Sequence, residues 1–144
     1  MAKYVFLLAA AALAAYSLHA CSRGKAGAGQ NYSVLTVDAE EFADLLKRRN
    51  VRLIDVRTAK EYAEGHLDEA ENMDVNRADF DTLCADVHGT VAVYCRGGKR
   101  SMKAARRLAA RGCTVYNLDG GIVAWRKAGK EVVTTGQLEP HVGK

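Results

Sequence analysis

Paired cysteines, long apolar runs and concentrated charge are all scarce in this sequence, and each absence excludes a class of protein. The four cysteines include no Cys-x-x-Cys pair, so the dithiol motif of thiol oxidoreductases is absent. The formal net charge is only +4 and most basic residues are scattered, whereas a nucleic-acid-binding domain would carry a basic patch. We therefore expect no nucleic-acid partner.

The remaining composition is that of an ordinary globular domain. Of the 144 residues, 49% are apolar and 26% are charged, and no internal repeat is visible. A chain of this size can bury a hydrophobic core without disulfides or metal ions. The sequence thus predicts one domain, with no metal and no cofactor, and a monomer is the default expectation.

The longest apolar run lies at the N-terminus. Residues 4–15 are almost purely apolar and follow a single positive charge, Lys3. A transmembrane helix needs about 20 apolar residues, so this run is too short, and its pattern is typical of a secretory signal. We expect residues 1–20 to be a signal peptide, and the protein to be exported.

The end of this segment predicts a lipid anchor. Leu18-His19-Ala20-Cys21 resembles the lipobox of bacterial lipoproteins, with Cys21 as the lipidated residue, although His19 departs from the usual small or β-branched residue. We expect anchoring to a bacterial membrane on its periplasmic or cell-surface side. Cleavage after Ala20 by the general signal peptidase and an uncleaved anchor are the alternatives.

A mature domain follows the N-terminal segment. Residues 21–32 read as a linker, 33–130 as the domain and 131–144 as a polar tail. Short apolar runs alternate with amphipathic segments, which predicts strands alternating with helices. The expected strands are 51–56, 73–75, 91–94 and 115–118; the expected helices begin with capping boxes at Asp38 and Thr58 or span 78–85, 101–111 and 122–127.

This alternation predicts an α/β domain with a parallel sheet and helices on both faces. Ligands of such sheets bind beyond the carboxyl ends of the strands. Cys95 directly follows the strand 91–94, which has the most buried composition. The sequence therefore indicates a functional role for Cys95.

The loop after this strand favours an ionised thiol. Gly97 and Gly98 allow a tight turn that directs backbone N–H groups to one point, and the following helix adds its positive N-terminal dipole. Arg96, Lys99 and Arg100 add positive charge. These features lower a thiol pKa, so we expect a nucleophilic thiolate. The alternative is a glycine-rich turn whose basic residues face solvent.

Three ordered motifs together resemble the rhodanese family. The loop matches Cys-x-x-Gly-x-Arg-Ser at Cys95, Gly98, Arg100 and Ser101. Residues 53–57, 61–62 and 65–67 resemble the family's N-terminal signature, and 117–121 with Trp125 its C-terminal signature; the resemblance spans about residues 34–130. One departure is Asp68-Glu69, where the family usually has Pro-Gly, which we expect to alter only a surface turn.

The resemblance implies a five-stranded parallel sheet and a sulfurtransferase that carries sulfur as a persulfide on Cys95. It implies that loop amides from Arg96 to Arg100 hold the persulfide, and that the side chains of Arg96, Lys99 and Arg100 attract an anionic donor such as thiosulfate. Cyanide or a thiol would be the acceptor. We expect ping-pong kinetics.

The same resemblance implies supporting residues around the loop. Arg100 is expected to pair with Asp55, and Ser101 to support the loop. Arg57 is assigned to the pocket mouth, with a surface role as the alternative. His66 is expected to be a hydrogen-bonded structural residue, and Trp125 to pack in the core.

Two other functions remain open for this cysteine. A sulfur-carrier or persulfide-relay role would use a protein partner in place of a small acceptor. Phosphatase or arsenate reductase chemistry occurs on the same fold, but with a Cys-x5-Arg loop; only four residues separate Cys95 from Arg100. Cys84 and Cys113 are expected to be small buried hydrophobic residues, with a disulfide between them as the alternative.

Overall fold

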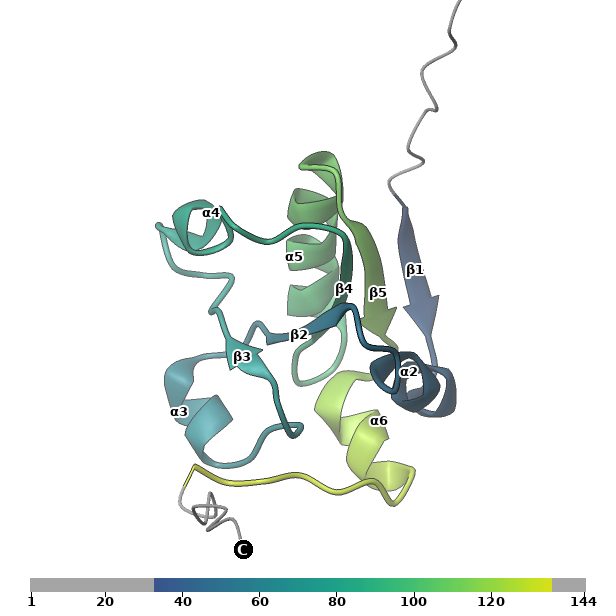
Figure 1. Cartoon of the computed structure of the whole chain (residues 1–144). Coiled ribbons are helices and arrows are strands. Elements are labelled where there is room, and N and C mark those ends of the chain that lie inside the picture. Colours follow the sequence, from purple (N-terminus) through teal and green to yellow (C-terminus); the bar gives the residue numbers. More distant parts are fainter. Residues whose placement is uncertain (1–32, 136–144) are drawn as a thin grey trace, which may run out of the picture. The chain divides into compact units, whose positions relative to one another are not determined.

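The computed structural model describes residues 33–135. Five parallel strands form one sheet in the order β1-β5-β4-β2-β3. Their bounds are β1 Val34–Val37, β2 Val51–Asp55, β3 Glu71–Asn72, β4 Thr90–Tyr94 and β5 Thr114–Leu118. The prediction of an α/β domain with a five-stranded parallel sheet is confirmed (Figure 1).

Helices cover both faces of this sheet. They are α2 Ala39–Leu46, α3 Ala59–Ala63, α4 Phe80–Leu83, α5 Lys99–Ala110 and α6 Gly121–Lys127. The helices α4 and α5 contribute to one buried cluster, and α2 and α6 contribute to a second. In the second cluster the rings of Phe42 and Trp125 meet edge to face, with centroids 6.2 Å apart. Trp125 is therefore a core residue, as predicted.

Alternate side chains of the central strand β4 belong to the two different clusters. Val91, Val93 and Cys95 belong to the cluster beneath α4 and α5, whereas Ala92 and Tyr94 belong to the cluster beneath α2 and α6. Successive side chains of a strand point to opposite faces. All five residues are buried, as expected for a strand covered on both sides.

Some element boundaries differ from the predictions. The third strand is Glu71–Asn72, not 73–75; Met73 and Val75 instead fill the core from an extended segment whose N–H groups donate to Asp55 and Val56 carbonyls. The strand Val34–Val37 was not predicted, because it is a short edge strand with a partly exposed pattern.

The two predicted N-caps are present, whereas the helices expected over 78–85, 101–111 and 122–127 begin at Phe80, Lys99 and Gly121. Asp38 accepts hydrogen bonds from the N–H groups of Glu40 and Glu41. Thr58 and Glu61 form a reciprocal capping box at the start of α3, which satisfies N–H groups that a helix cannot bond internally. The β2–α3 connection is thereby fixed, and Glu61 lies at a defined position in the first turn.

The turn at Asp68-Glu69 is the departure from the family pattern noted above. Glu69 has φ of 61°, a left-handed conformation that favours glycine and costs other residues about 1 kcal/mol. Both residues are exposed, and the Ala70 N–H donates to the Leu67 carbonyl across the turn. The departure therefore lies in a surface turn, as expected.

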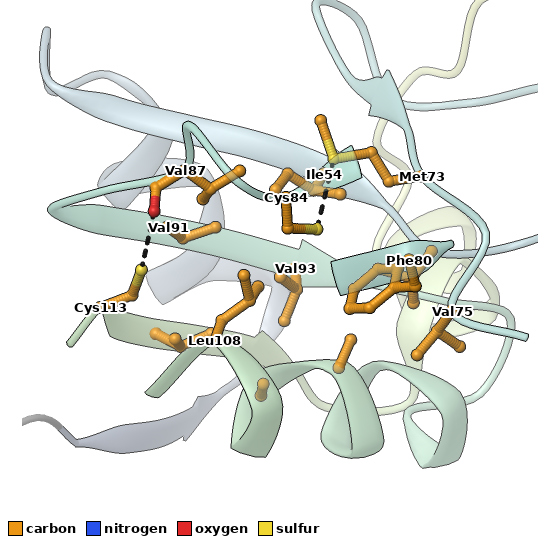
Figure 2. Packing of buried hydrophobic residues seen from close by; sticks show 14 of the residues in the cluster. Ile54, Met73, Val75, Phe80, Cys84, Val87, Val91, Val93, Leu108 and Cys113 are labelled. Atoms are coloured by element: carbon orange, nitrogen blue, oxygen red, sulfur yellow. Dashed lines mark hydrogen bonds between the residues drawn. The ribbon is translucent and has the colours of Figure 1, made fainter. Parts of the chain in front are cut away.

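Figure 2 shows the cluster that contains Cys84 and Cys113. The Cys84 Sγ lies 3.6 Å from the Met73 sulfur, whereas the Cys113 Sγ lies 3.5 Å from the Val87 carbonyl oxygen. Both thiols are free and buried, and burial raises the pKa of each. The prediction that they are small buried hydrophobic residues is confirmed.

Within 33–135, no helix has the length and apolar character to cross a bilayer. The predicted signal peptide, Cys21, the linker up to residue 32 and the tail beyond residue 135 lie outside the described residues.

Candidate active site

The predicted nucleophile lies where the topology of the sheet places ligands. Cys95 immediately follows β4 and precedes α5. The connection after β2 leads outward to β3, whereas the connection after β4 leads the opposite way to β5. Between these two strands the order reverses, and such a switch point leaves a crevice at the carboxyl ends of the strands. Cys95 therefore lies beside the expected binding crevice.

The Cys95 sulfur lies inside a ring of hydrogen-bond donors. The N–H of Gly98 donates to its Sγ at 3.1 Å, and the Ser101 hydroxyl lies 3.4 Å from the same atom. Burial raises the pKa of the Cys95 thiol, but hydrogen bonds from the Ser101 hydroxyl and from the backbone amides of Ser101, Gly97 and Gly98 outweigh it. The net pKa lies below its ordinary value, so the thiolate forms more readily than in a free cysteine.

The left-handed residue Gly98 makes this ring possible. Its φ of 97° places it at the N-cap of α5, where the chain turns from the loop into the helix. The hydroxyl of Ser101 also lies 3.0 Å from the Gly98 carbonyl oxygen. Ser101 is fully buried, and its two contacts join the first turn of α5 to the Cys95 loop.

The N-terminus of α6 holds the loop from behind. The N–H of Ile122 donates to the Cys95 carbonyl at 2.9 Å, and the N–H of Val123 donates to the Arg96 carbonyl at 3.2 Å. The carbonyls of Cys95 and Arg96 thus bond to α6, while the amides of Gly97 and Gly98 donate to the Cys95 sulfur. The loop and α6 approach closely at Gly121, where a Cβ would lie 2.6 Å from the Arg96 carbonyl carbon.

Arg100 is held by a carboxylate from a different element than expected. Its two terminal nitrogens each lie 2.7 Å from a Glu61 carboxylate oxygen. The predicted pair between Arg100 and Asp55 is wrong. Asp55 lies at the end of β2 and is completely buried, whereas Glu61 projects from the first turn of α3 and reaches the loop. This bidentate geometry is the strongest form of such a pair.

Asp55 is paired with Arg57 instead. The Arg57 side chain contacts both Asp55 carboxylate oxygens, the nearer at 2.5 Å, and donates to the Gly65 carbonyl at 2.7 Å. Arg57 is only 5% exposed, so its assignment to the pocket mouth or the surface is wrong. The close spacing of the two residues lets the guanidinium fold back onto the carboxylate. This buried pair fixes the segment that leads to Glu61.

The other predicted residues divide into exposed and structural groups. Arg96 and Lys99 are exposed; Arg96 directly follows Cys95, and Lys99 is at the first position of α5. His66 is 4% exposed, and its Nδ1 lies 2.9 Å from the Tyr62 carbonyl oxygen while the two rings stack. These contacts fit the structural role expected for His66.

Glu61 and Gly121 are the two site residues that sequence reasoning missed. Glu61 was identified only as a capping residue and as part of the N-terminal family signature, with no role in the site. It is 39 positions from Arg100, so no local pattern links them. Gly121 carried a usable signal, because paired glycines after a strand indicate backbone conformations that other residues rarely adopt. The φ angles of Gly120 and Gly121 are 64° and 58°.

Replacing Glu61 by Gln is expected to remove an acid-sensitive part of the stability. The hydrogen bonds from Arg100 hold the pKa of the Glu61 carboxyl at about 2 instead of 4.5. A carboxyl with a lowered folded-state pKa contributes stability above its unfolded pKa and loses it as pH falls through the folded one. Between about pH 5 and pH 2 the wild type should lose about 1–2 kcal/mol more than Glu61→Gln, after allowance for solvent screening.

Urea unfolding of both proteins across this pH range measures the difference. The matched control is Asp79→Asn, which breaks the exposed Arg77–Asp79 pair and should leave the pH profile nearly unchanged. Parallel profiles for the wild type and Glu61→Gln would contradict the role of this pair.

Comparison with known proteins agrees with this geometry. The model of the rhodanese-like domain matches residues 38–128. The chain is 37% identical over 101 residues to a thiosulfate sulfurtransferase GlpE of Pseudomonas fluorescens, which covers 69% of this chain and 92% of that protein. A sulfurtransferase of Allochromatium vinosum is 32% identical, over 67% of this chain and 92% of that protein.

A solved structure shows the same fold. The crystal structure of a rhodanese-related protein from Thermoplasma volcanium superimposes with a TM-score of 0.58 at 27% identity, covering 69% of this chain and 97% of the other. The region that the family model matches contains the Cys95 loop, Gly120 and Gly121 at the start of α6, and the α3 turn that carries Glu61. This chain belongs to the family of rhodanese-like domain proteins.

Proposed function

We propose that this protein is a sulfurtransferase that moves sulfane sulfur from thiosulfate, or a similar anionic donor, to cyanide or a thiol through a persulfide on Cys95. The observation that carries the proposal is the donor ring around the Cys95 Sγ, with its lowered pKa. The similarity to named sulfurtransferases supports the same chemistry.

The first half-reaction loads the cysteine. The Cys95 thiolate attacks the outer sulfur of thiosulfate, a bond forms between Sγ and that sulfur, and sulfite leaves with the electron pair of the broken sulfur–sulfur bond. The exposed charges of Arg96 and Lys99 attract the dianion. The amides of Gly97 and Gly98, which lower the Cys95 pKa, are placed to stabilise the terminal sulfur of the persulfide anion.

The second half-reaction returns the thiolate. Cyanide or a thiolate attacks the outer sulfur, the bond to Sγ breaks, and Cys95 leaves with the electron pair. Neither half-reaction requires a general base when the thiol is already ionised, which is consistent with the absence of histidine from the loop. The lowered pKa also makes the Cys95 thiolate a better leaving group than that of an ordinary cysteine.

The size of the loop favours sulfur over phosphate. Four residues lie between Cys95 and Arg100, and Arg100 is already engaged by Glu61. Cys95 is only 1% exposed, so a donor must present a narrow atom to the sulfur. The terminal sulfur of thiosulfate meets this condition better than a tetrahedral phosphoryl centre.

Intact-mass measurement after incubation with thiosulfate tests the proposal. We expect a gain of about 32 Da, one sulfur atom, that cyanide removes, because the persulfide is the covalent intermediate of the cycle. Peptide mapping should place the added mass on Cys95, with Cys84 and Cys113 as internal controls. An unchanged mass, or sulfur on either control cysteine, would refute the proposed cycle.

We propose further that the protein is exported and lipid-anchored through Cys21, on the strength of the Leu18-His19-Ala20-Cys21 sequence. Cys21→Ser is expected to move the protein from the membrane fraction to the soluble fraction, because stable anchoring depends on the attached acyl chains. Fractionation followed by immunoblotting measures this change. Continued membrane association of the variant would favour an uncleaved N-terminal anchor.

A further inference from the structure

The outer face of α5 carries a row of cations that begins at the Cys95 loop. Lys99, Lys103 and Arg106 are exposed and spaced by four and three residues, which places them on one side of the helix. Arg96 is exposed just before the helix begins. At a rise of about 1.5 Å per residue, this basic stripe of four residues extends about 10 Å along α5 beyond the loop.

The stripe differs from the neighbouring cations in having no acidic partner among residues 33–135. Arg100 is paired with Glu61, and Arg107 is paired with Asp81. The ion pairs formed among residues 33–135 include none of the four stripe residues. In the described part of the chain, the four charges on this surface therefore have no ion-pair partner.

The stripe also has an apolar component. Met102 is half-buried and lines a common groove with Lys99, Lys103 and Arg106. A flexible thioether between cations allows contact with apolar as well as acidic side chains. Such a mixture suits a protein surface better than a small inorganic ion, which would use charge alone.

We propose that this basic stripe docks an acidic face of a partner protein that exchanges sulfur with Cys95. The inference rests on the proposed function and names a substrate class for it. Arg96 and Lys99 are close enough in sequence to serve a small dianion at the loop, but Lys103 and Arg106 lie one and two turns further along α5. A ligand that uses all four must extend along the helix, and a macromolecule with complementary charge does so.

A protein partner is favoured over a lipid surface by the position of the stripe. It starts at the loop that contains the reactive sulfur, so a docked protein can present a thiol to Cys95. That thiolate attacks the outer sulfur of the persulfide, the bond to the Cys95 Sγ breaks, and Cys95 leaves as the thiolate. An anionic bilayer offers charge but no thiol.

Synthetic peptides with one cysteine test the proposal. One peptide is rich in Asp and Glu, and its control replaces these residues by Asn and Gln. Full-length protein is loaded with thiosulfate, its persulfide content is measured by mass, and the rate of sulfur transfer to each peptide is followed. We expect at least a tenfold preference for the acidic peptide at low ionic strength, and its disappearance at about 0.5 M salt.

The matched variants are Lys103→Glu/Arg106→Glu and Arg48→Glu/Arg49→Glu. Both replace two exposed cations by two anions. The second pair, however, lies just before β2, at the amino-terminal ends of the parallel strands, whereas Cys95 lies at their carboxyl ends. Only the first should abolish the preference for the acidic peptide. Both should keep the wild-type rate with thiosulfate and cyanide, since neither pair lies in the loop.

Binding measurements separate this proposal from the proposed function. Fluorescence anisotropy of cysteine-free versions of both peptides reports docking even if no persulfide forms. Equal binding of the acidic and neutral peptides, or equal effects of the two variants, would overturn the docking proposal. Loss of binding to anionic phospholipid vesicles by the Lys103→Glu/Arg106→Glu variant, with peptide binding unchanged, would overturn it in favour of a membrane surface.

Discussion

Replacing Cys95 by Ser is expected to reduce sulfur transfer by at least about a thousandfold, because the hydroxyl is not ionised at neutral pH and cannot carry a sulfur atom. Serine has nearly the same size, and the Gly98 N–H that meets the sulfur at 3.1 Å can donate to an oxygen instead. The fold should therefore be retained. Thiocyanate formation from thiosulfate and cyanide measures the loss, and circular dichroism reports the fold.

The control for this variant is Cys113→Ser. Cys113 is equally buried, and its Sγ lies 3.5 Å from the Val87 carbonyl oxygen, to which a serine hydroxyl can donate. It lies at the opposite end of β4 from the loop, since the following Thr114 pairs with Thr90. Activity should persist in Cys113→Ser. Residual thiocyanate formation by folded Cys95→Ser at a wild-type rate would assign the chemistry to another residue.

Gly121→Ala is expected to be the most damaging change outside the loop itself. A Cβ at this position would contact the Cys95 carbonyl oxygen and lie 2.6 Å from the Arg96 carbonyl carbon and oxygen, far inside van der Waals contact. These are backbone atoms of the Cys95 loop and cannot move away without displacing the sulfur. We expect a loss of about 3 kcal/mol or more in the free energy of unfolding, together with slower alkylation of Cys95 at neutral pH.

Gly129→Ala separates the steric effect from the backbone effect. Gly129 also has a left-handed φ, 74°, but a Cβ there would meet nothing within 4 Å. Its replacement should cost only about 1 kcal/mol, the conformational penalty alone, and should leave the alkylation rate unchanged. Urea unfolding and iodoacetamide kinetics on both variants measure the comparison. Similar losses in the two variants would show that the contact with the loop is unimportant.

The parts of the molecule that sequence could predict are those encoded locally. The apolar run before Cys95, the glycines after it and the capping pair Thr58–Glu61 each depend on neighbouring residues. They were sufficient to predict the parallel sheet, the two capped helix starts and the position of Cys95 at the carboxyl end of a central strand. The burial of Cys84 and Cys113 also followed from their apolar surroundings.

The parts that sequence could not predict depend on contacts between distant segments. Asp55 could have paired with Arg100 or with Arg57, since both are cations near the same sheet edge, and only three-dimensional packing decides between them. Glu61 is the partner of Arg100 because α3 and the loop meet in space. The boundaries of β3 could not be predicted for the same reason. That strand lies where Asn72 pairs with Asp55 of β2, and local propensity does not determine this position.

The alternation of side chains along β4 restricts where a rhodanese-like domain can gain or lose residues. Val91, Val93 and Cys95 share one face of the sheet, so a single inserted or deleted residue within β4 would turn the sulfur to the Tyr94 face, away from α5 and its amides. Two residues would restore the face but shift the sulfur by about 7 Å along the strand. Insertions in the exposed turn at Asp68-Glu69 carry no such penalty, which makes that turn a permissive site for natural variation and for engineered tags.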